Sequence, residues 1–234
     1  MKKIRLWDLP TRLFHWLLVA AIAALFVTIK ADMDGGIDWH AKIGLFVVGL
    51  IAFRLTWGFV GSTYARFFQF FPTPGKIIAY LKGEWHELGH NPLGALSVFA
   101  LLALTALQVG LGLFTNDDIS FQGSLYPLID SDLSATLTGW HRYLAYGLLA
   151  VIGLHLASIV FYKLVKKHNL IPPMLTGKIE VADTEAGKEA KGGGIVALII
   201  ALAIAALAVW GASGAWIPAP PPPPPATEIQ PPAW

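Results

Sequence analysis

Five long apolar runs constrain the fold of this sequence more than any other feature. A helix needs roughly 20 apolar residues to cross a hydrocarbon core about 30 Å thick, so each run is long enough, or nearly so, to span a membrane. With 55% hydrophobic and 14% charged residues, the chain is too apolar for a soluble domain of 234 residues. We therefore expect an all-α integral membrane protein with five spans. The runs lie near residues 13–29, 43–60, 93–114, 143–162 and 195–217.

Basic residues predict the orientation of the chain, because Lys and Arg accumulate in cytoplasmic loops. They cluster before the first run, between the second and third runs, and after the fourth, whereas acidic residues concentrate in the other loops. No small-residue cleavage pattern follows the first run, which we interpret as a retained span and not as a signal peptide. We expect a cytoplasmic N-terminus and an external C-terminus. The net charge of +2 then reflects topology and gives no indication of nucleic-acid binding.

Composition divides the chain into four parts. Residues 1–167 hold the first four runs and predict an up-down four-helix bundle. Residues 168–194 turn polar and end in KGGG, which is typical of a flexible linker, here on the cytoplasmic side. Residues 195–217 form a fifth span without ionisable side chains, and residues 218–234 are Pro-rich and predict an extended rod on the outer side.

Two of these parts leave alternatives open. Small residues from Gly211 to Ala215 allow close helix packing, so the fifth span either docks on the bundle or a partner, or faces lipid. The Pro-rich tail is either a spacer or a docking segment for a partner. Before the third run, TPGKIIAYLKG predicts a short helix at the membrane surface that starts at Pro74 and stops at Gly83.

Four histidines lie within the apolar runs or at their mouths, where ionisable residues are costly and indicate function. His141 and His155 are 14 positions apart. That spacing is within about 40° of four helical turns and rises about 21 Å, so the two share a face at different depths. His40 matches the outer depth and His15 the inner one. The sequence therefore predicts an outer pair, His40 with His141, and an inner pair, His15 with His155.

Two imidazoles that face each other across a helical bundle suit six-coordinate haem iron, which takes one nitrogen from each face of the ring. The chain has no cysteine, which excludes disulfides, thiolate-bound iron–sulfur clusters and covalent haem attachment. Its methionines, Met1, Met33 and Met174, all lie outside the runs, which leaves bis-histidine ligation. We therefore predict two haem b groups whose iron is bound by these two histidine pairs.

Haem propionates are anionic and need cations or water beside them. Lys42 and Arg142 adjoin the outer pair, and Arg12 and Arg54 lie at the inner level. We predict that these four side chains contact propionates, with ordinary positions at the membrane interface as the alternative. The remaining histidines are expected to be solvated at the cytoplasmic surface, and they are His86, His90 and His168.

Six stretches of the chain carry a family resemblance: LWDLPTRLFHWLLVA, DWHAKIGL, FRLTWGFVG, GHNPLGAL, TNDDISFQG and LTGWHRYLAYGLLAVIGLHLASIVFYKLVKKHNLIPPMLTG. Over roughly residues 4–178 the chain resembles the prokaryotic cytochrome b561 family, which is similar to the b-type cytochrome subunits of nickel–iron hydrogenases. The resemblance implies a bacterial inner (cytoplasmic) membrane protein that exchanges electrons with the quinone pool. It also implies two b haems with one ligand on the first helix, one on the second and two on the fourth. Those positions are the same four histidines, whereas the fifth span and the Pro-rich tail depart from the short family form.

We expect a membrane electron-transfer protein that passes electrons between a quinone or quinol and a redox partner, a periplasmic c-type cytochrome. With a quinol donor it would act as a quinol oxidoreductase. One alternative is a membrane anchor and electron-transfer subunit of a hydrogenase-like complex. Another is a transporter without haem, in which the histidines form a relay. For His86 and His90, a further alternative is a proton relay to a quinone. Membrane lipid surrounds the chain in every case, and a monomer and a homodimer fit equally well.

Overall fold

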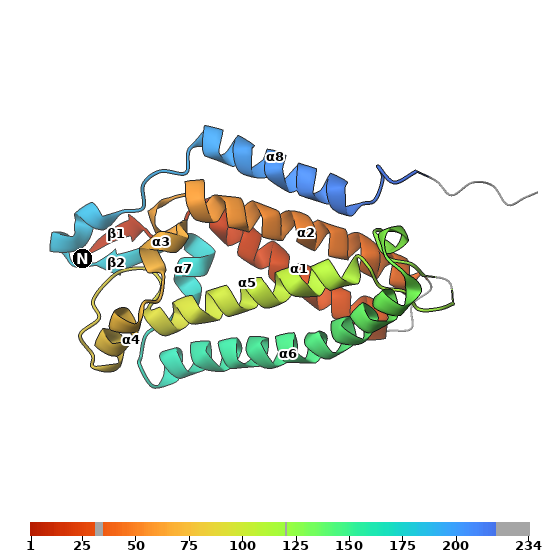
Figure 1. The fold of residues 1–234 in the computed structure, drawn as a ribbon. Helices are drawn as coiled ribbons and strands as arrows, with labels where there is room; N and C mark the ends of the chain where they lie inside the picture. Colours follow the sequence, from red (N-terminus) through yellow and green to blue (C-terminus); the bar gives the residue numbers. More distant parts are fainter. Residues whose placement is uncertain (31–34, 120, 219–234) are drawn as a thin grey trace, which may run out of the picture.

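Five long helices form the body of the molecule. The structure is a computed structural model, and it describes residues 1–30, 35–119 and 121–218. Each is long and apolar enough to cross a membrane, and successive helices run in opposite directions (Figure 1). The prediction of an all-α multi-pass membrane protein is confirmed. The fourth helix begins well before the predicted run because polar residues 131–142 continue the same helix out of the apolar region. The five are α1 (Leu9–Lys30), α2 (Gly36–Val60), α5 (Pro92–Gly112), α6 (Ser131–Leu164) and α8 (Ile195–Ala212).

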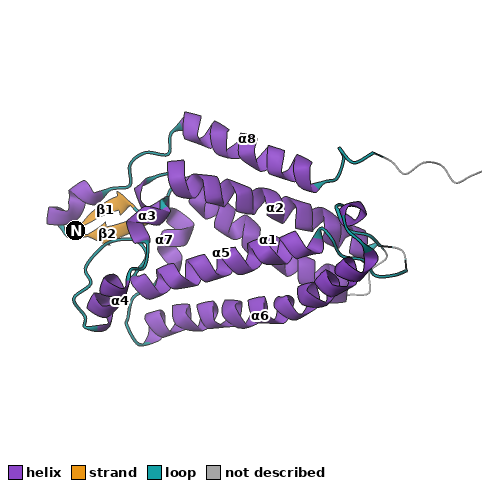
Figure 2. Ribbon diagram, in the orientation of Figure 1, coloured by secondary structure: helices purple, strands orange, loops and turns teal. Residues whose placement is uncertain are grey.

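Most of the short elements gather at one end of the bundle (Figure 2), whereas the 3-10 turn Tyr126–Leu128 lies at the other end. Strands β1 (Lys2–Arg5) and β2 (Lys178–Val181) pair antiparallel at the first of these ends, with Lys2 opposite Val181. We call this the strand end, and we call the opposite end, where residues 113–130 connect α5 to α6, the loop end. The other short helices are α3 (Phe67–Phe70), α4 (Pro74–Leu81), α7 (Ile171–Thr176) and the 3-10 turns Thr63–Ala65, Tyr126–Leu128 and Asp183–Lys188.

The short helix predicted before the third apolar run is confirmed as α4. Thr73 caps it by accepting a hydrogen bond from the Lys76 amide at 3.4 Å, and Pro74 occupies its first turn. Gly83 follows its end with φ of 80°, a left-handed conformation that glycine adopts without steric cost. The start and stop residues therefore act as the sequence indicated.

Residues 168–194 correct the prediction of a flexible linker, because they contain α7 and β2 and pack on the strand end. The Arg5 guanidinium donates to the Ala190 carbonyl at 2.8 Å, and the Thr63 amide donates to the Lys191 carbonyl at 2.8 Å. Composition did not reveal this order because its hydrogen bonds are largely made by the backbone, to segments far away in sequence. We call residues 177–194 the strap, since they lead from β2 to α8.

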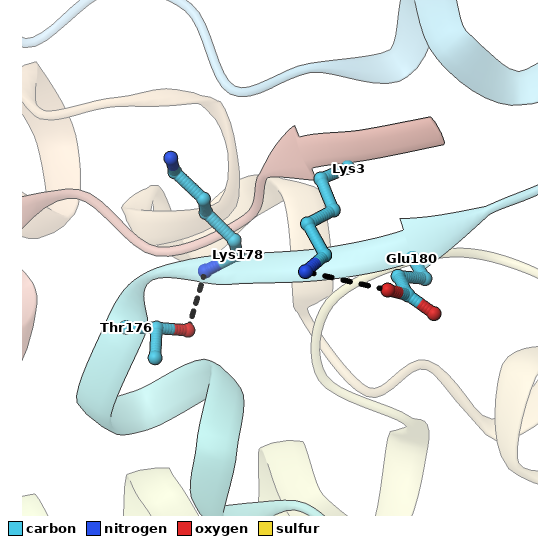
Figure 3. Close-up of polar contacts among 4 residues, drawn as sticks. All are labelled: Lys3, Thr176, Lys178 and Glu180. Atoms are coloured by element: carbon cyan, nitrogen blue, oxygen red, sulfur yellow. Dashed lines mark hydrogen bonds and ion pairs between the residues drawn. The ribbon is translucent and has the colours of Figure 1, made fainter. Parts of the chain in front are cut away.

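Figure 3 shows the side-chain contacts that accompany the strand pair. The Lys3 ammonium lies 3.5 Å from the Glu180 carboxylate, and the Lys178 amide donates to the Thr176 hydroxyl at 3.2 Å. Both members of the ion pair are more than half exposed, and such pairs contribute at most about 1 kcal/mol. The backbone ladder, and not this ion pair, therefore holds β1 to β2.

Helix α8 docks lengthwise on α2, which decides between the alternatives for the fifth span (Figure 1). Small residues make the close approach possible: Ala201 is fully buried, and a Cβ on Gly49 would lie 2.9 Å from a Val209 methyl carbon. The docking residue on the bundle side is thus a glycine of α2. Apart from Pro218, the predicted tail at 218–234 lies outside the described residues.

Candidate functional site

A cavity of about 540 Å³ opens between α1, α2, α5 and α6 at the loop end. Its wall is mainly apolar, and both His40 and His141 line it. Residues 113–119 and 121–125 lie at one edge, where the Leu125 amide donates to the Leu113 carbonyl at 2.8 Å. The volume falls within the roughly 300–1,000 Å³ of ligand and cofactor sites. The loop end therefore offers an apolar chamber with two imidazoles on its wall.

The rings of His40 and His141 face each other across this cavity. Their centroids are 6.2 Å apart, and their planes are 84° apart. Two metal–nitrogen bonds of about 2 Å, with about 1 Å from nitrogen to ring centre, would give roughly 6 Å between centroids. The observed spacing would therefore allow His40 and His141 to hold one metal ion between them.

Backbone carbonyls fix the tautomers of this pair. The Nδ1 atom of His40 lies 3.1 Å from the Leu25 carbonyl oxygen, and the Nδ1 atom of His141 lies 3.0 Å from the Gln108 carbonyl oxygen. A carbonyl only accepts hydrogen bonds, so each Nδ1 carries the proton and each Nε2 keeps its lone pair. Histidines that bind metals commonly make this second hydrogen bond. Both side chains are thus prepared to ligate through Nε2.

His15 and His155 form the second predicted pair, on α1 and α6 toward the strand end. They lie close enough for a charge on His155 to act on His15. The His155 Nδ1 atom is 3.4 Å from the Ser97 hydroxyl, and the His15 Nδ1 atom has no hydrogen-bond partner among the described residues. Trp16 packs edge-on against the His15 ring at 5.0 Å. The structure thus brings the members of each predicted pair near each other. The Nδ1 atoms of the second pair have weaker hydrogen bonds, or none among the described residues, compared with those of the first pair.

Two cations line the loop-end cavity, namely Arg142 and Lys30. Arg142 is among the predicted propionate contacts, whereas the sequence analysis did not single out Lys30. Its position as the last residue of α1, at the end of the bundle where His40 lies, was the available signal. Lys42 extends instead over the Trp39 ring, with its ammonium 5.1 Å from the ring centre.

The other two predicted cations are held at the strand end. The Arg12 guanidinium donates to the Leu175 carbonyl. Arg54 is buried, donates to the Ala65 carbonyl at 3.1 Å, and lies 4.6 Å from the centre of the Phe67 ring. Backbone and aromatic contacts therefore use part of the bonding capacity of both guanidinium groups, and their contacts with propionates stay a prediction.

His90 corrects the expectation of a solvated side chain. Its ring packs between Trp7 and Phe70, with centroids 4.6 and 4.5 Å away, and its Nδ1 atom has no partner within the described part of the chain. Burial, together with the smaller effect of the nearby positive charge of Arg54, lowers the pKa of His90 to about 3. His90 is therefore neutral at physiological pH, whereas His86 is exposed as expected.

A smaller pocket of about 220 Å³ lies beside His90 at the strand end. Phe70, Trp85 and His90 supply flat ring surfaces on its wall, and Gln69 and Glu87 supply polar groups. The Trp85 indole nitrogen is buried and lacks a partner among the described residues, as does the His90 Nδ1 atom. An indole N–H can only donate. The pocket is therefore suited to a small planar group with an acceptor oxygen.

Two tyrosines and an asparagine join three elements next to this pocket. The Asn91 amide donates to the Tyr162 hydroxyl at 2.8 Å, and the hydroxyls of Tyr80 and Tyr162 are in contact. Tyr162 follows His155 by seven residues, so it lies about 10 Å along α6 on the same face. The sequence analysis missed this cluster, although the seven-residue spacing was visible.

Comparisons with known proteins place this geometry in context. A family model described as prokaryotic cytochrome b561 matches residues 6–177, which include all four paired histidines. A probable Ni/Fe-hydrogenase B-type cytochrome subunit of Azotobacter vinelandii is 27% identical over 214 residues, which cover 74% of this chain and 87% of that protein. A probable Ni/Fe-hydrogenase 1 B-type cytochrome subunit of Escherichia coli K12 is 23% identical over 133 residues, 44% of this chain and 56% of that protein. No solved structure gave a significant match.

Proposed function

Because the chain belongs to the prokaryotic cytochrome b561 family, we propose that it holds two bis-histidine haem b groups and passes electrons between quinone and a redox partner. Family membership makes it a membrane electron-transfer protein of the haem b type. Bound haem iron supplies one-electron chemistry, and the residues of the chain orient and enclose it.

The observation that carries this proposal is the His40–His141 pair. Its rings are 6.2 Å apart in an apolar cavity, and both Nδ1 atoms lie on backbone carbonyls. A bundle core that holds two imidazoles at this spacing, each with its proton on Nδ1, suits an axial ligand pair. His155 lies about 21 Å along α6 from His141. His15 is close enough to be affected by a charge on His155, so we propose these two residues as the second ligand pair. Arg12, Lys42, Arg54 and Arg142 remain the proposed propionate contacts, and Lys30 joins them.

We propose the strand-end pocket as the place where a quinone head group exchanges electrons. The unpartnered Trp85 indole N–H supplies a donor for a quinone carbonyl, and the rings of Phe70 and His90 supply flat walls. His90 also lies near enough to His15 and His155 to be affected by their charges, so the pocket adjoins the second ligand pair. A quinone ring bound in this pocket would lie close to His15 and His155, which supports the proposal that quinone binds here.

The redox partner is proposed to act at the loop end, beside the His40–His141 pair. With the N-terminus in the cytoplasm, as the basic residues predict, the loop end faces the periplasm of a bacterial inner membrane. A periplasmic c-type cytochrome fits that side. The names of two relatives favour a second candidate, in which the chain is the b-type cytochrome subunit of a hydrogenase-like complex. Both candidates use the same electron path.

The contacts around the paired histidines do not support the hypothesis of a transporter without haem. The amide of Gln108, a polar group of α5, contacts His141 and does not extend a polar path. Among residues 1–30, 35–119 and 121–218, no group of three or more His, Cys, Asp or Glu side chains is placed to hold a metal ion. The histidines are grouped in pairs, which suits axial ligation and not a relay.

A quinol-driven reduction assay tests the proposed function. Purified protein is mixed with a short-chain quinol, and haem reduction is followed optically for wild type, Trp85→Phe and His86→Gln. Loss of one hydrogen bond predicts a KM about 3- to 10-fold higher for Trp85→Phe, with haem spectra unchanged. His86→Gln, on the exposed side of the same segment, is the matched control and should behave as wild type. Equal KM values for all three proteins would exclude this pocket, and no reduction of wild type by any quinol would exclude the quinone reaction.

A further inference from the structure

One turn of α5 surrounds the His141 ring on three sides. The backbone carbonyl of Gln108 lies 3.0 Å from His141 Nδ1. The side-chain amide of Gln108 donates to the His141 carbonyl at 3.0 Å, and the same nitrogen lies 3.3 Å from His141 Nε2. An amide nitrogen donates, so this contact requires a lone pair on Nε2, and the carbonyl contact requires a proton on Nδ1. Both neighbours therefore select one tautomer.

Gly112 completes this turn, four residues after Gln108. A Cβ at Gly112 would lie 3.0 Å from Cε1 and 3.4 Å from Nδ1 of His141. A side chain there would force the imidazole to move by a few tenths of an ångström. At Gly110, two residues earlier on the same helix, a Cβ would meet nothing within 4 Å. The close approach of the ring therefore requires glycine at 112 and not at 110.

We propose that the turn from Gln108 to Gly112 is the positioning element of His141, which sets its ring plane and keeps the lone pair on Nε2, where iron would replace the Gln108 amide. This inference rests on the proposed function, because it concerns the axial ligand of the loop-end haem. Neither residue touches the metal in this account, and both act through His141. Gln108 and Gly112 are four residues apart on one helix, so they lie next to each other on the same face.

The two histidines of α6 differ in this support. His141 has a backbone carbonyl 3.0 Å from Nδ1, whereas the Nδ1 partner of His155 within the described residues is the Ser97 hydroxyl at 3.4 Å. A hydrogen bond from Nδ1 raises the basicity of the ligating nitrogen, and a more basic ligand favours the ferric state. The positioning turn therefore lowers the midpoint potential of the loop-end haem relative to a haem at His15 and His155.

Three variants test the positioning turn: Gly112→Ala, Gly110→Ala and Gln108→Leu. Haem content is measured by pyridine haemochrome, the midpoint potentials by redox titration, and the ligand geometry by low-spin EPR. Gly112→Ala should raise one of two midpoint potentials and shift the EPR signal of that haem, while the other haem stays unchanged. Gly110→Ala should match wild type in every readout. Gln108→Leu should shift the same haem, because it removes the amide that holds the His141 backbone.

Three outcomes would decide against the inference or against its premise. If Gly112→Ala and Gly110→Ala both show two unshifted haems, the positioning role is wrong while the proposed function stands. If Gly112→Ala yields no folded protein, Gln108→Leu carries the test, and two unshifted potentials in that variant overturn the inference. If wild type itself binds no haem, the proposed function fails, and the inference fails with it.

Discussion

Asp8 is a buried carboxylate that links the start of α1 to α2 at the strand end. It accepts hydrogen bonds from the Thr11 amide at 2.7 Å and from the Trp57 indole at 3.0 Å. It also acts electrostatically on the buried Arg54 guanidinium. A single residue thus satisfies an amide at the start of α1 and compensates a buried cation of α2.

Replacement of Asp8 by Ala is predicted to destabilise the protein strongly. The change leaves two buried donors without acceptors, and each unsatisfied donor costs about 1–3 kcal/mol. We expect the free energy of unfolding to fall by roughly 2–4 kcal/mol, measured as a lower Tm in detergent. Asp183→Asn is the control, because Asp183 makes an exposed ion pair with the N-terminus. Equal Tm shifts for the two variants would refute the role of Asp8.

His90 makes stability sensitive to acid. Its pKa is about 3 in the folded protein, below the ordinary value of 6.5, so the unfolded chain takes up a proton first as the pH falls. The stabilisation is complete above pH 6.5 and is lost between pH 6.5 and 3. We predict that Tm falls less between pH 7 and 5 in His90→Gln than in wild type. His86→Gln should keep the wild-type dependence, and an identical pH dependence in all three proteins would contradict this account.

The proposed ligand residues were easier to predict from the sequence than the residues that hold them in place. His141 and His155 follow from helical periodicity, because 14 residues return to one face of a helix. Gln108 and Gly112 do not, since their role depends on how closely α5 approaches α6, which no local pattern encodes. His90 looked solvated for a related reason: the rings that bury it come from residues 7 and 70, distant in sequence.

At the scale of elements, α8 and the strap together wrap the four-helix body. The strap begins at Gly177, whose carbonyl accepts from the Leu6 amide at 2.8 Å, and it reaches α8 at Gly194. The fifth span was predictable from its apolar length, whereas its seat on α2 depends on Gly49, an ordinary glycine when read in sequence. The type of this element could be predicted from its local composition. Its docking site could not, because that depends also on the surface of α2 on which it packs.

Gly49→Val is predicted to loosen α8. A Cβ at this position would lie 2.9 Å from a Val209 carbon, and the branched side chain adds two further methyl groups, so α8 must move outward. We expect several-fold faster proteolysis within the strap, measured by mass spectrometry of the fragments. Gly211→Ala, at a position of α8 where a Cβ meets nothing within 4 Å, should keep the wild-type rate. Equal cleavage rates would show that α8 is held elsewhere.

At the scale of the whole molecule, the two ends of the bundle differ in chemistry. The strand end carries the N-terminus, the strap and the smaller polar pocket, and the loop end carries the larger apolar cavity. In the proposed function, the smaller pocket would take the quinone head group, and the second redox partner would act at the loop end. The orientation proposed from the basic residues places the strand end in the cytoplasm and the loop end in the periplasm.

The absence of cysteine from the chain allows a direct test of that orientation. Single cysteines are introduced as Ile119→Cys at the loop end and Glu84→Cys at the strand end, both at exposed positions. In intact cells, a membrane-impermeant thiol reagent should label only Ile119→Cys, and cell lysis should make Glu84→Cys reactive. The reverse labelling pattern would invert the proposed topology.

The most direct test of the central claim is the haem content of the purified protein. Reduced-minus-oxidised spectra and pyridine haemochrome quantitation are compared for wild type, His155→Ala and His168→Ala, the last a control at an exposed histidine. The account predicts two low-spin b haems per chain in wild type and in His168→Ala, and one lost or converted to high spin in His155→Ala. Well-folded wild-type protein without haem, or a His155→Ala spectrum identical to wild type, would contradict it.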